Sequence, residues 1–101
     1  MTAWTYMLRC ADGSFYVGCT TNLETRMAQH HAGTFAGYTC DRRPVTLVWS
    51  DECEDVLDAI AMERRIKGWN RAKKIALIQG DWDLIRALGL RPSRRASPSS
   101  G

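Results

Sequence analysis

Long apolar runs are missing from this sequence of 101 residues. No stretch approaches the roughly 20 consecutive apolar residues that a membrane-spanning helix needs, so we expect no membrane span. The first residues read as a strand and lack the basic, apolar and small-residue regions of a signal peptide. Together these absences favour a cytoplasmic location.

Paired metal-binding cysteines are also missing. The four cysteines are separated by 9, 21 and 13 positions, so none forms a CxxC pair. Without a signal peptide we expect free thiols rather than disulfides. A zinc site could be assembled from His30, His31, Cys40 and Cys53, but their spacing matches no common ligand pattern, and this interpretation is disfavoured.

A large excess of charge is absent from most of the chain. Three of the fourteen basic residues lie beyond position 90, so the first ninety residues carry eleven basic and eleven acidic side chains. Acidic residues cluster at 51–58, whereas the segment 64–74 carries six basic residues and no acidic one. This basic segment suits phosphate binding, although a solvated helix face explains the charge equally well.

What the sequence does contain is a succession of strand, turn and helix patterns. Asp12-Gly13 indicates a hairpin turn, Thr21 with Glu24 fits a capping box, and Asn70 can cap a later helix. The expected elements are strands at 3–9, 15–19 and 44–50 and helices at about 22–31, 53–67, 71–79 and 81–89. We therefore expect an α+β fold, a small three-stranded antiparallel sheet flanked by helices, in the order strand, strand, helix, strand, helix, helix.

The composition changes near the C-terminus. Residues 1–90 have the mixed apolar and polar pattern of one folded domain. Residues 91–101 are basic and rich in Ser and Pro, which is typical of a disordered tail.

Glu63 is the least expected side chain in the predicted helix 53–67. It stands three residues after Ile60 and three before Ile66, and therefore on the apolar stripe. A carboxylate is costly to bury unless it is paired or holds a metal. An ion pair with Lys67, four residues on, or a position at the edge of the stripe that reaches water is the simpler explanation.

Four other polar side chains stand on the first three predicted elements. Arg26 and His30 are four residues apart on one helix face, where they could bind a phosphate or simply be exposed. His31 points about 100° away and is expected to face solvent. Tyr6 and Tyr16 lie on paired strands, and each alone is typical of a core or cross-strand aromatic.

In their order and spacing, these residues resemble the GIY-YIG nuclease superfamily, in particular its small single-domain members. The resemblance covers about residues 3–80. It rests on "WTY" at 4–6, "YVG" at 16–18, "TNLETRMAQH" at 21–30, "GYTCDRRPVTLVW" at 37–49 and "ERRIKGWNRAKKIALI" at 63–78. Trp4 and Thr5 stand where the first motif has Gly and Ile, and Cys19 stands where several members have a lysine that can lower the pKa of a tyrosine.

The resemblance implies a metal-dependent DNA endonuclease that hydrolyses phosphodiester bonds. The implied roles are a general base for Tyr6, orientation of nucleophile and phosphate for Tyr16, contact with the scissile phosphate for Arg26, a place near the reacting group for His30 and the holding of Mg²⁺ or Mn²⁺ for Glu63. A free tyrosine has a pKa of about 10, so the base needs help at neutral pH. The metal, Arg26 and a protonated His30 are the groups expected to lower the pKa of Tyr6.

The expected partner is DNA, in a role in repair or recombination, while RNA and branched or single-stranded forms remain open. Contacts to nucleic acid are expected from Lys67, Arg71, Lys73, Lys74, Arg42 and Arg43. Two other classes of function stay open. One is a nucleic-acid-binding module with a weak or lost active site. The other is an interaction domain whose basic segment 64–74 binds an acidic protein.

Overall fold

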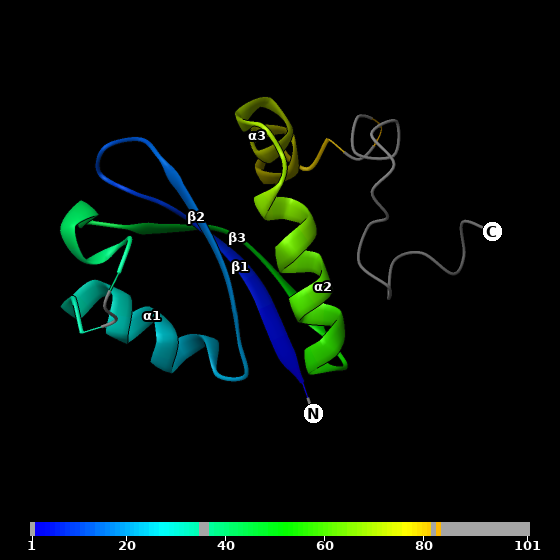
Figure 1. Cartoon of the computed structure of the whole chain (residues 1–101), viewed down its shortest axis with the longest axis horizontal. Coiled ribbons are helices and arrows are strands. Elements are labelled where there is room, and N and C mark those ends of the chain that lie inside the picture. The colour runs from blue at the N-terminus through cyan, green and yellow to red at the C-terminus, as the bar shows by residue number, and fades with distance from the viewer. Residues whose placement is uncertain (1, 35–36, 82, 84–101) are drawn as a thin grey trace.

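A computed structural model describes residues 2–34, 37–81 and 83 of the chain. It contains a three-stranded antiparallel sheet in the order β2-β1-β3. The elements are β1 (Ala3–Arg9), β2 (Phe15–Thr20), α1 (Leu23–Ala32), the short 3₁₀ helix η1 (Cys40–Arg42), β3 (Thr46–Cys53), α2 (Val56–Lys67) and α3 (Arg71–Gln79). In Figure 1, α1 lies on one side of the strands, and α2 and α3 lie on the other. The predicted α+β architecture and element order are confirmed.

Two predictions cannot be compared with the structure. The helix expected at 81–89 lies almost wholly outside the described residues, and the tail at 91–101 lies wholly outside them. Within the described part of the chain, every helix is too short or too polar to cross a membrane.

β1 is the central strand, and both of its faces are covered. Successive side chains point to opposite faces of a strand. Met7 packs with Ile66 of α2 on one face, and Thr5 donates a hydrogen bond to the Ala59 carbonyl of the same helix at 2.8 Å. Tyr6 and Leu8 pack on the other face with α1. All four of these β1 side chains are fully buried, so Tyr6 is held rigidly in the core.

β2 lies at one edge of the sheet, between α1 on one face and α2 on the other (Figure 1). Val17 points into the core with Met7, while Tyr16, the preceding residue, points to the α1 face and packs against Tyr6. Because the two helices flank this edge from opposite faces, side chains from both can meet there.

The starts of three elements differ from the sequence predictions. The capping-box prediction at Thr21 is wrong, because the backbone is still extended at Asn22, whose side chain accepts the hydrogen bond from the Thr25 amide at 3.0 Å. β3 begins after Pro44 and continues to Cys53, because its pairing with β1 extends to Ala3. α2 therefore starts later than expected, with Asp55 as its cap.

Candidate active site

Tyr6, His30 and Thr39 form a buried hydrogen-bonded chain. The Tyr6 hydroxyl lies 2.9 Å from Nε2 of His30, and Nδ1 of His30 lies 2.8 Å from Oγ1 of Thr39. Tyr6 and His30 have no exposed surface, and Thr39 is 1 % exposed. Each ring nitrogen of His30 thus has a hydroxyl partner in either neutral tautomer. His30 therefore fixes the position of the Tyr6 hydroxyl.

Both ionisable members of this chain favour their neutral forms. Burial raises the pKa of Tyr6 to about 12, against a smaller lowering by a hydrogen bond from Arg26. Burial and the nearby Arg26 charge lower the pKa of His30 to about 4. The expectation that a protonated His30 lowers the pKa of Tyr6 is therefore wrong, because His30 is neutral near pH 7. His31 is exposed, as its helical position predicts.

Tyr16 joins this buried chain to the surface. Its ring centroid lies 6.3 Å from that of Tyr6 and 5.5 Å from that of His30. Gly18 makes this packing possible: an added Cβ would stand 2.7 Å from the Tyr6 hydroxyl and 3.1 Å from Cε2 of Tyr16. Tyr16 is half-buried, and burial raises the pKa of its hydroxyl. The two tyrosines and His30 therefore form one aromatic cluster on the α1 side of β2.

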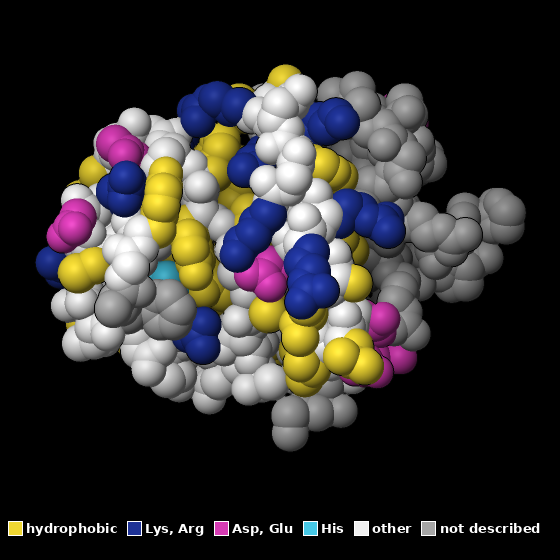
Figure 2. Space-filling model, viewed as in Figure 1, with side chains coloured by type: hydrophobic (Ala, Val, Ile, Leu, Met, Phe, Trp, Pro, Cys, Tyr) yellow, Lys and Arg dark blue, Asp and Glu magenta, His cyan; other side chains and the backbone are white. Residues whose placement is uncertain are grey.

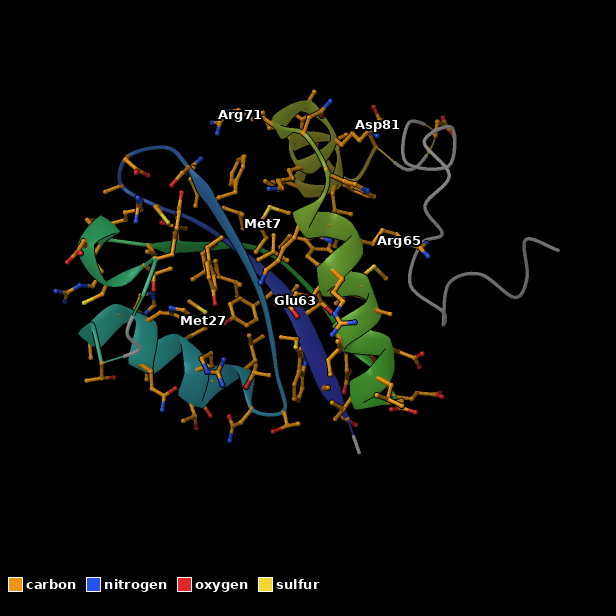
Figure 3. The ribbon with its side chains drawn as sticks, in the orientation of Figure 1. Met7, Met27, Glu63, Arg65, Arg71 and Asp81 are labelled. Atoms are coloured by element: carbon orange, nitrogen blue, oxygen red, sulfur yellow. The ribbon has the colours of Figure 1, made fainter. Side chains whose placement is uncertain are left out.

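Glu63 approaches the same strand edge from α2. Its side chain is 17 % exposed and forms an ion pair with Lys67, with 2.8 Å between Oε2 and Nζ. The Cys19 thiol donates to Oε1 at 3.5 Å, and burial with the Glu63 charge raises the pKa of that thiol. Figure 3 shows Glu63 pointing from α2 toward β2, while Arg65 points away from the sheet. The proposed Glu63–Lys67 ion pair is confirmed.

Arg26 contacts both the aromatic cluster and Cys19, the residue whose thiol donates to Glu63. Its Nη1 donates to the Cys19 carbonyl at 3.5 Å, and its side chain hydrogen-bonds the Tyr6 hydroxyl. The residue is half-buried. The structure therefore gathers Tyr6, Tyr16, Arg26, His30 and Glu63 from two strands and two helices around one edge of the sheet.

The loop before β3 adds a stack of side chains next to Tyr16. Tyr38 stacks on Tyr16 with ring centroids 6.1 Å apart, and the Arg42 guanidinium lies 3.8 Å from the Tyr38 ring centroid. Arg42 also forms an ion pair with Asp12 at 3.1 Å, and Arg43 donates to the Cys40 carbonyl at 3.0 Å. The two arginines expected to contact nucleic acid thus have partners within the protein.

The remaining predicted nucleic-acid contacts lie on α2 and α3. Arg71 donates to the Gly13 carbonyl at 2.7 Å and lies over the Phe15 ring. Lys73 and Lys74 are half-buried, and burial lowers the pKa of Lys74. Figure 2 shows Lys and Arg side chains gathered over α2 and α3, with an acidic side chain among those on α2. This face carries both basic charge and the Glu63 carboxylate.

Sequence reasoning missed two contributors to the site. Thr39 carried no local signal, because its link to His30 depends on how the loop after α1 folds back. Cys19 was noted only as the replacement of a lysine, and its thiol contact with Glu63 joins β2 to α2. A hydroxyl nine residues after a buried histidine is too common a pattern to predict such a bond.

Glu63 could hold a divalent cation only as a single carboxylate ligand. Among the described residues no group of three His, Cys, Asp or Glu side chains gathers in one place. Mg²⁺ commonly uses one or two carboxylates and completes its shell with water and substrate oxygens. The single, partly exposed Glu63 carboxylate fits such a site once a bound phosphate completes it, although Lys67 is the cation that pairs with it in the free protein.

The class of protein follows from a match to a known family: the GIY-YIG catalytic domain matches residues 2–76, so the chain belongs to the GIY-YIG family. More particularly, it is similar to UPF0213 proteins, which form a small GIY-YIG family. A UPF0213 protein from Staphylococcus haemolyticus is 41 % identical over 76 residues, which is 75 % of this chain and 93 % of the relative. One from Halobacterium salinarum is 43 % identical over 72 residues, 71 % of this chain and 94 % of the relative.

Solved structures agree with this family assignment. The solution structure of a UPF0213 protein from Bacillus halodurans matches with a TM-score of 0.53 and 35 % identity, over 78 % of this chain and 84 % of that one. The solution structure of a protein from E. faecalis matches with a TM-score of 0.56 and 35 % identity, over 79 % and 85 %. The sheet and helices described above are therefore a fold shared with experimental structures.

Proposed function

We propose that this domain is a metal-dependent endonuclease that hydrolyses phosphodiester bonds in DNA, in a role in repair or recombination. The observation that supports the proposal best is the convergence of two tyrosines, an arginine and a carboxylate at the β2 edge, from both faces of the sheet. Arg26 and Glu63 both contact Cys19 at this edge, although they come from helices on opposite faces of the sheet.

The positive groups of the site would bind the phosphate. Arg26 offers a planar set of donors that matches phosphate oxygens and stabilises the charge that develops during attack. A Mg²⁺ or Mn²⁺ ion held by Glu63 would act as a Lewis acid toward the phosphate and its leaving oxygen. Tyr16, at the solvent side of the cluster, would orient the phosphate by hydrogen bonding.

Tyr6 and His30 would together accept the proton of the attacking water. With a pKa of about 12, Tyr6 keeps its proton at neutral pH. When the hydroxyl oxygen of Tyr6 takes a proton from water, its own proton can pass to Nε2 of His30, 2.9 Å away. Since the pKa of His30 is about 4, it holds this proton only briefly. We therefore expect slow cleavage near pH 7.

Access to Tyr6 requires a movement of Arg26. The Tyr6 hydroxyl is buried in the free protein, and Arg26 is hydrogen-bonded to it. When the Arg26 guanidinium turns to a phosphate, it leaves the hydroxyl open toward the substrate. Binding of a phosphate would thus expose the Tyr6 hydroxyl to the attacking water.

The decisive experiment is nicking of supercoiled plasmid with Mg²⁺ or Mn²⁺. Wild-type protein should convert plasmid to the open circle, and Glu63→Gln should lower the rate by at least about a hundredfold, because the substitution removes the carboxylate charge that holds the ion. Glu24→Gln, which neutralises an exposed carboxylate at the start of α1, should retain activity. Equal nicking by wild type and Glu63→Gln would contradict the proposal.

A second function is supported by the same geometry. The Glu63–Lys67 ion pair and the raised pKa of Tyr6 suit a nucleic-acid-binding module whose active site is weak or lost. Salt-sensitive binding of DNA by the wild-type protein, without metal-dependent nicking, would select this function over the nuclease.

A further inference from the structure

In the free protein, the Lys67 side chain forms an ion pair with the Glu63 carboxylate. Its ammonium lies 2.8 Å from Oε2 of Glu63 and 6.0 Å from the centroid of the Tyr16 ring. The lysine side chain is 50 % exposed, whereas that of Glu63 is 17 % exposed. The cation thus covers the outer side of the carboxylate and faces the aromatic cluster.

This ion pair can open at little cost. An ion pair at i and i+4 whose lysine is half exposed contributes little to stability, because water competes for the ammonium. Lysine carries its charge on a flexible chain and binds phosphate as a point charge. No backbone movement is needed, because Lys67 is the last residue of α2 and its side chain reaches solvent.

The other basic residues near this edge have different surroundings. Arg71 is bound to the Gly13 carbonyl and covers Phe15, and Arg65 points away from the sheet in Figure 3. Arg26 approaches from α1, on the other face, and contacts the Cys19 carbonyl. Among these residues, Lys67 is the one in direct contact with the carboxylate.

We propose that Lys67 exchanges between two anionic partners, Glu63 in the free protein and a substrate phosphate in the complex. While Lys67 pairs with Glu63, its positive charge opposes a divalent cation at the same carboxylate. A bound phosphate draws the ammonium away and leaves Glu63 to the cation. This inference rests on the proposed function, and it adds that cation and nucleic acid bind with positive coupling.

The coupling is reciprocal by linkage. If phosphate binding strengthens cation binding by some factor, the cation strengthens phosphate binding by the same factor. The free protein would then hold Mg²⁺ weakly and complete its site only on the substrate. The domain would then release its Mg²⁺ ion when it leaves a substrate and bind a new ion on the next one.

The first measurement is binding of Mn²⁺ alone, followed by electron paramagnetic resonance of the free ion. Lys67→Met should tighten binding about three- to tenfold, because it removes the competing charge and keeps the aliphatic stem. Arg65→Met is the matched control on the same helix and should change the affinity by less than about twofold. Thermal unfolding of each variant establishes that the fold is retained.

The second measurement is binding of a fluorescein-labelled DNA dodecamer with and without Ca²⁺. Ca²⁺ should tighten dodecamer binding in wild type and by about the same factor in Arg65→Met. In Lys67→Met the gain should be at least about threefold smaller, because only the direct contact between cation and phosphate remains. Unchanged Mn²⁺ affinity in Lys67→Met, with binding lost in Glu63→Gln, would overturn the exchange but leave the Glu63 site intact. Unchanged Mn²⁺ affinity in Glu63→Gln would overturn the proposed metal site itself.

Discussion

At the scale of single residues, His30 has a role different from that of an exposed phosphate ligand. It is fully buried between Tyr6 and Thr39, with both ring nitrogens hydrogen-bonded. A neutral imidazole can satisfy both contacts by donating from one nitrogen and accepting at the other. Burial and the Arg26 charge disfavour the imidazolium, so the folded state requires His30 to be neutral near pH 7.

This requirement predicts acid sensitivity of the fold. The pKa of His30 falls from 6.5 in the unfolded chain to about 4 in the folded protein. Between these values the unfolded chain binds more protons, so stability is full above about pH 6.5 and decreases as the pH falls toward 4. We expect a loss of roughly 1–3 kcal/mol from this group, measured by urea unfolding at pH 7 and pH 4.5.

The chain provides its own control for this prediction. His31 is the other histidine, and it is exposed. His30→Gln should be less stable than wild type at pH 7 and should lose part of the pH dependence, whereas His31→Gln should keep it. If both variants retain the wild-type slope, carboxylates rather than His30 govern acid unfolding.

At the scale of secondary-structure elements, β2 is shaped by a close contact between strands. Gly18 pairs with Tyr6 across the sheet, and the Tyr6 ring folds over the glycine Cα position. The buried ring cannot move aside, because His30 and α1 enclose it. The strand therefore needs a residue without a side chain at this point.

Gly18→Ala tests the contact. Its Cβ would meet the Tyr6 hydroxyl at 2.7 Å and Cζ at 2.8 Å, so the ring must shift and its bond to His30 must stretch. We expect a loss of about 1–3 kcal/mol in the free energy of unfolding, measured by urea denaturation. Gly68→Ala, at an ordinary negative φ with 3.6 Å to the nearest atom, should be close to neutral. Equal stability of the two variants would mean that Tyr6 is not held as described.

These elements also show how far the sequence predicts the structure. Periodicity and turn residues were sufficient for the hairpin, for α3 and its Asn70 cap, and for the sheet with its flanking helices. The spacing of Glu63 and Lys67 was sufficient to predict their ion pair. Such features depend on neighbours within a few positions.

Other features depend on contacts between distant parts of the chain. The end of β3 was predicted too early, because its pairing with Ala3 decides where the strand stops. The burial of His30 was not predicted, because helical spacing places it with Arg26 but does not show that the loop after α1 covers it with Thr39. Roles in catalysis and metal binding remain predictions at the residues assigned to them.

At the scale of the whole molecule, basic and acidic side chains gather on different stretches of the chain. The basic side chains gather over α2 and α3 (Figure 2), while an acidic cluster follows from the end of β3 to the start of α2. Nucleic acid should therefore approach along the α2–α3 face and reach Glu63 from there.

Salt dependence measures this contact. Replacement of Lys73 and Lys74 by glutamine should weaken dodecamer binding. It should also reduce the slope of log affinity against log salt by about 1–2, because binding with fewer phosphate contacts releases fewer counterions. Arg65→Gln should change the slope less, because this side chain points away from the sheet. An unchanged slope in the double variant would place the DNA on another face.

The distribution of the site along the chain has a consequence for synthesis on the ribosome. The first thirty residues to leave the ribosome contain four of the proposed site residues, Tyr6, Tyr16, Arg26 and His30. Glu63 and Lys67 follow more than thirty residues later, on α2, which packs against the opposite face of the sheet. The early segment can arrange a hairpin and one helix, yet it has no carboxylate at the β2 edge. Under the proposed function, a nascent chain would therefore gain its metal-binding carboxylate, and with it the ability to hydrolyse phosphodiester bonds, only after α2 has emerged and docked.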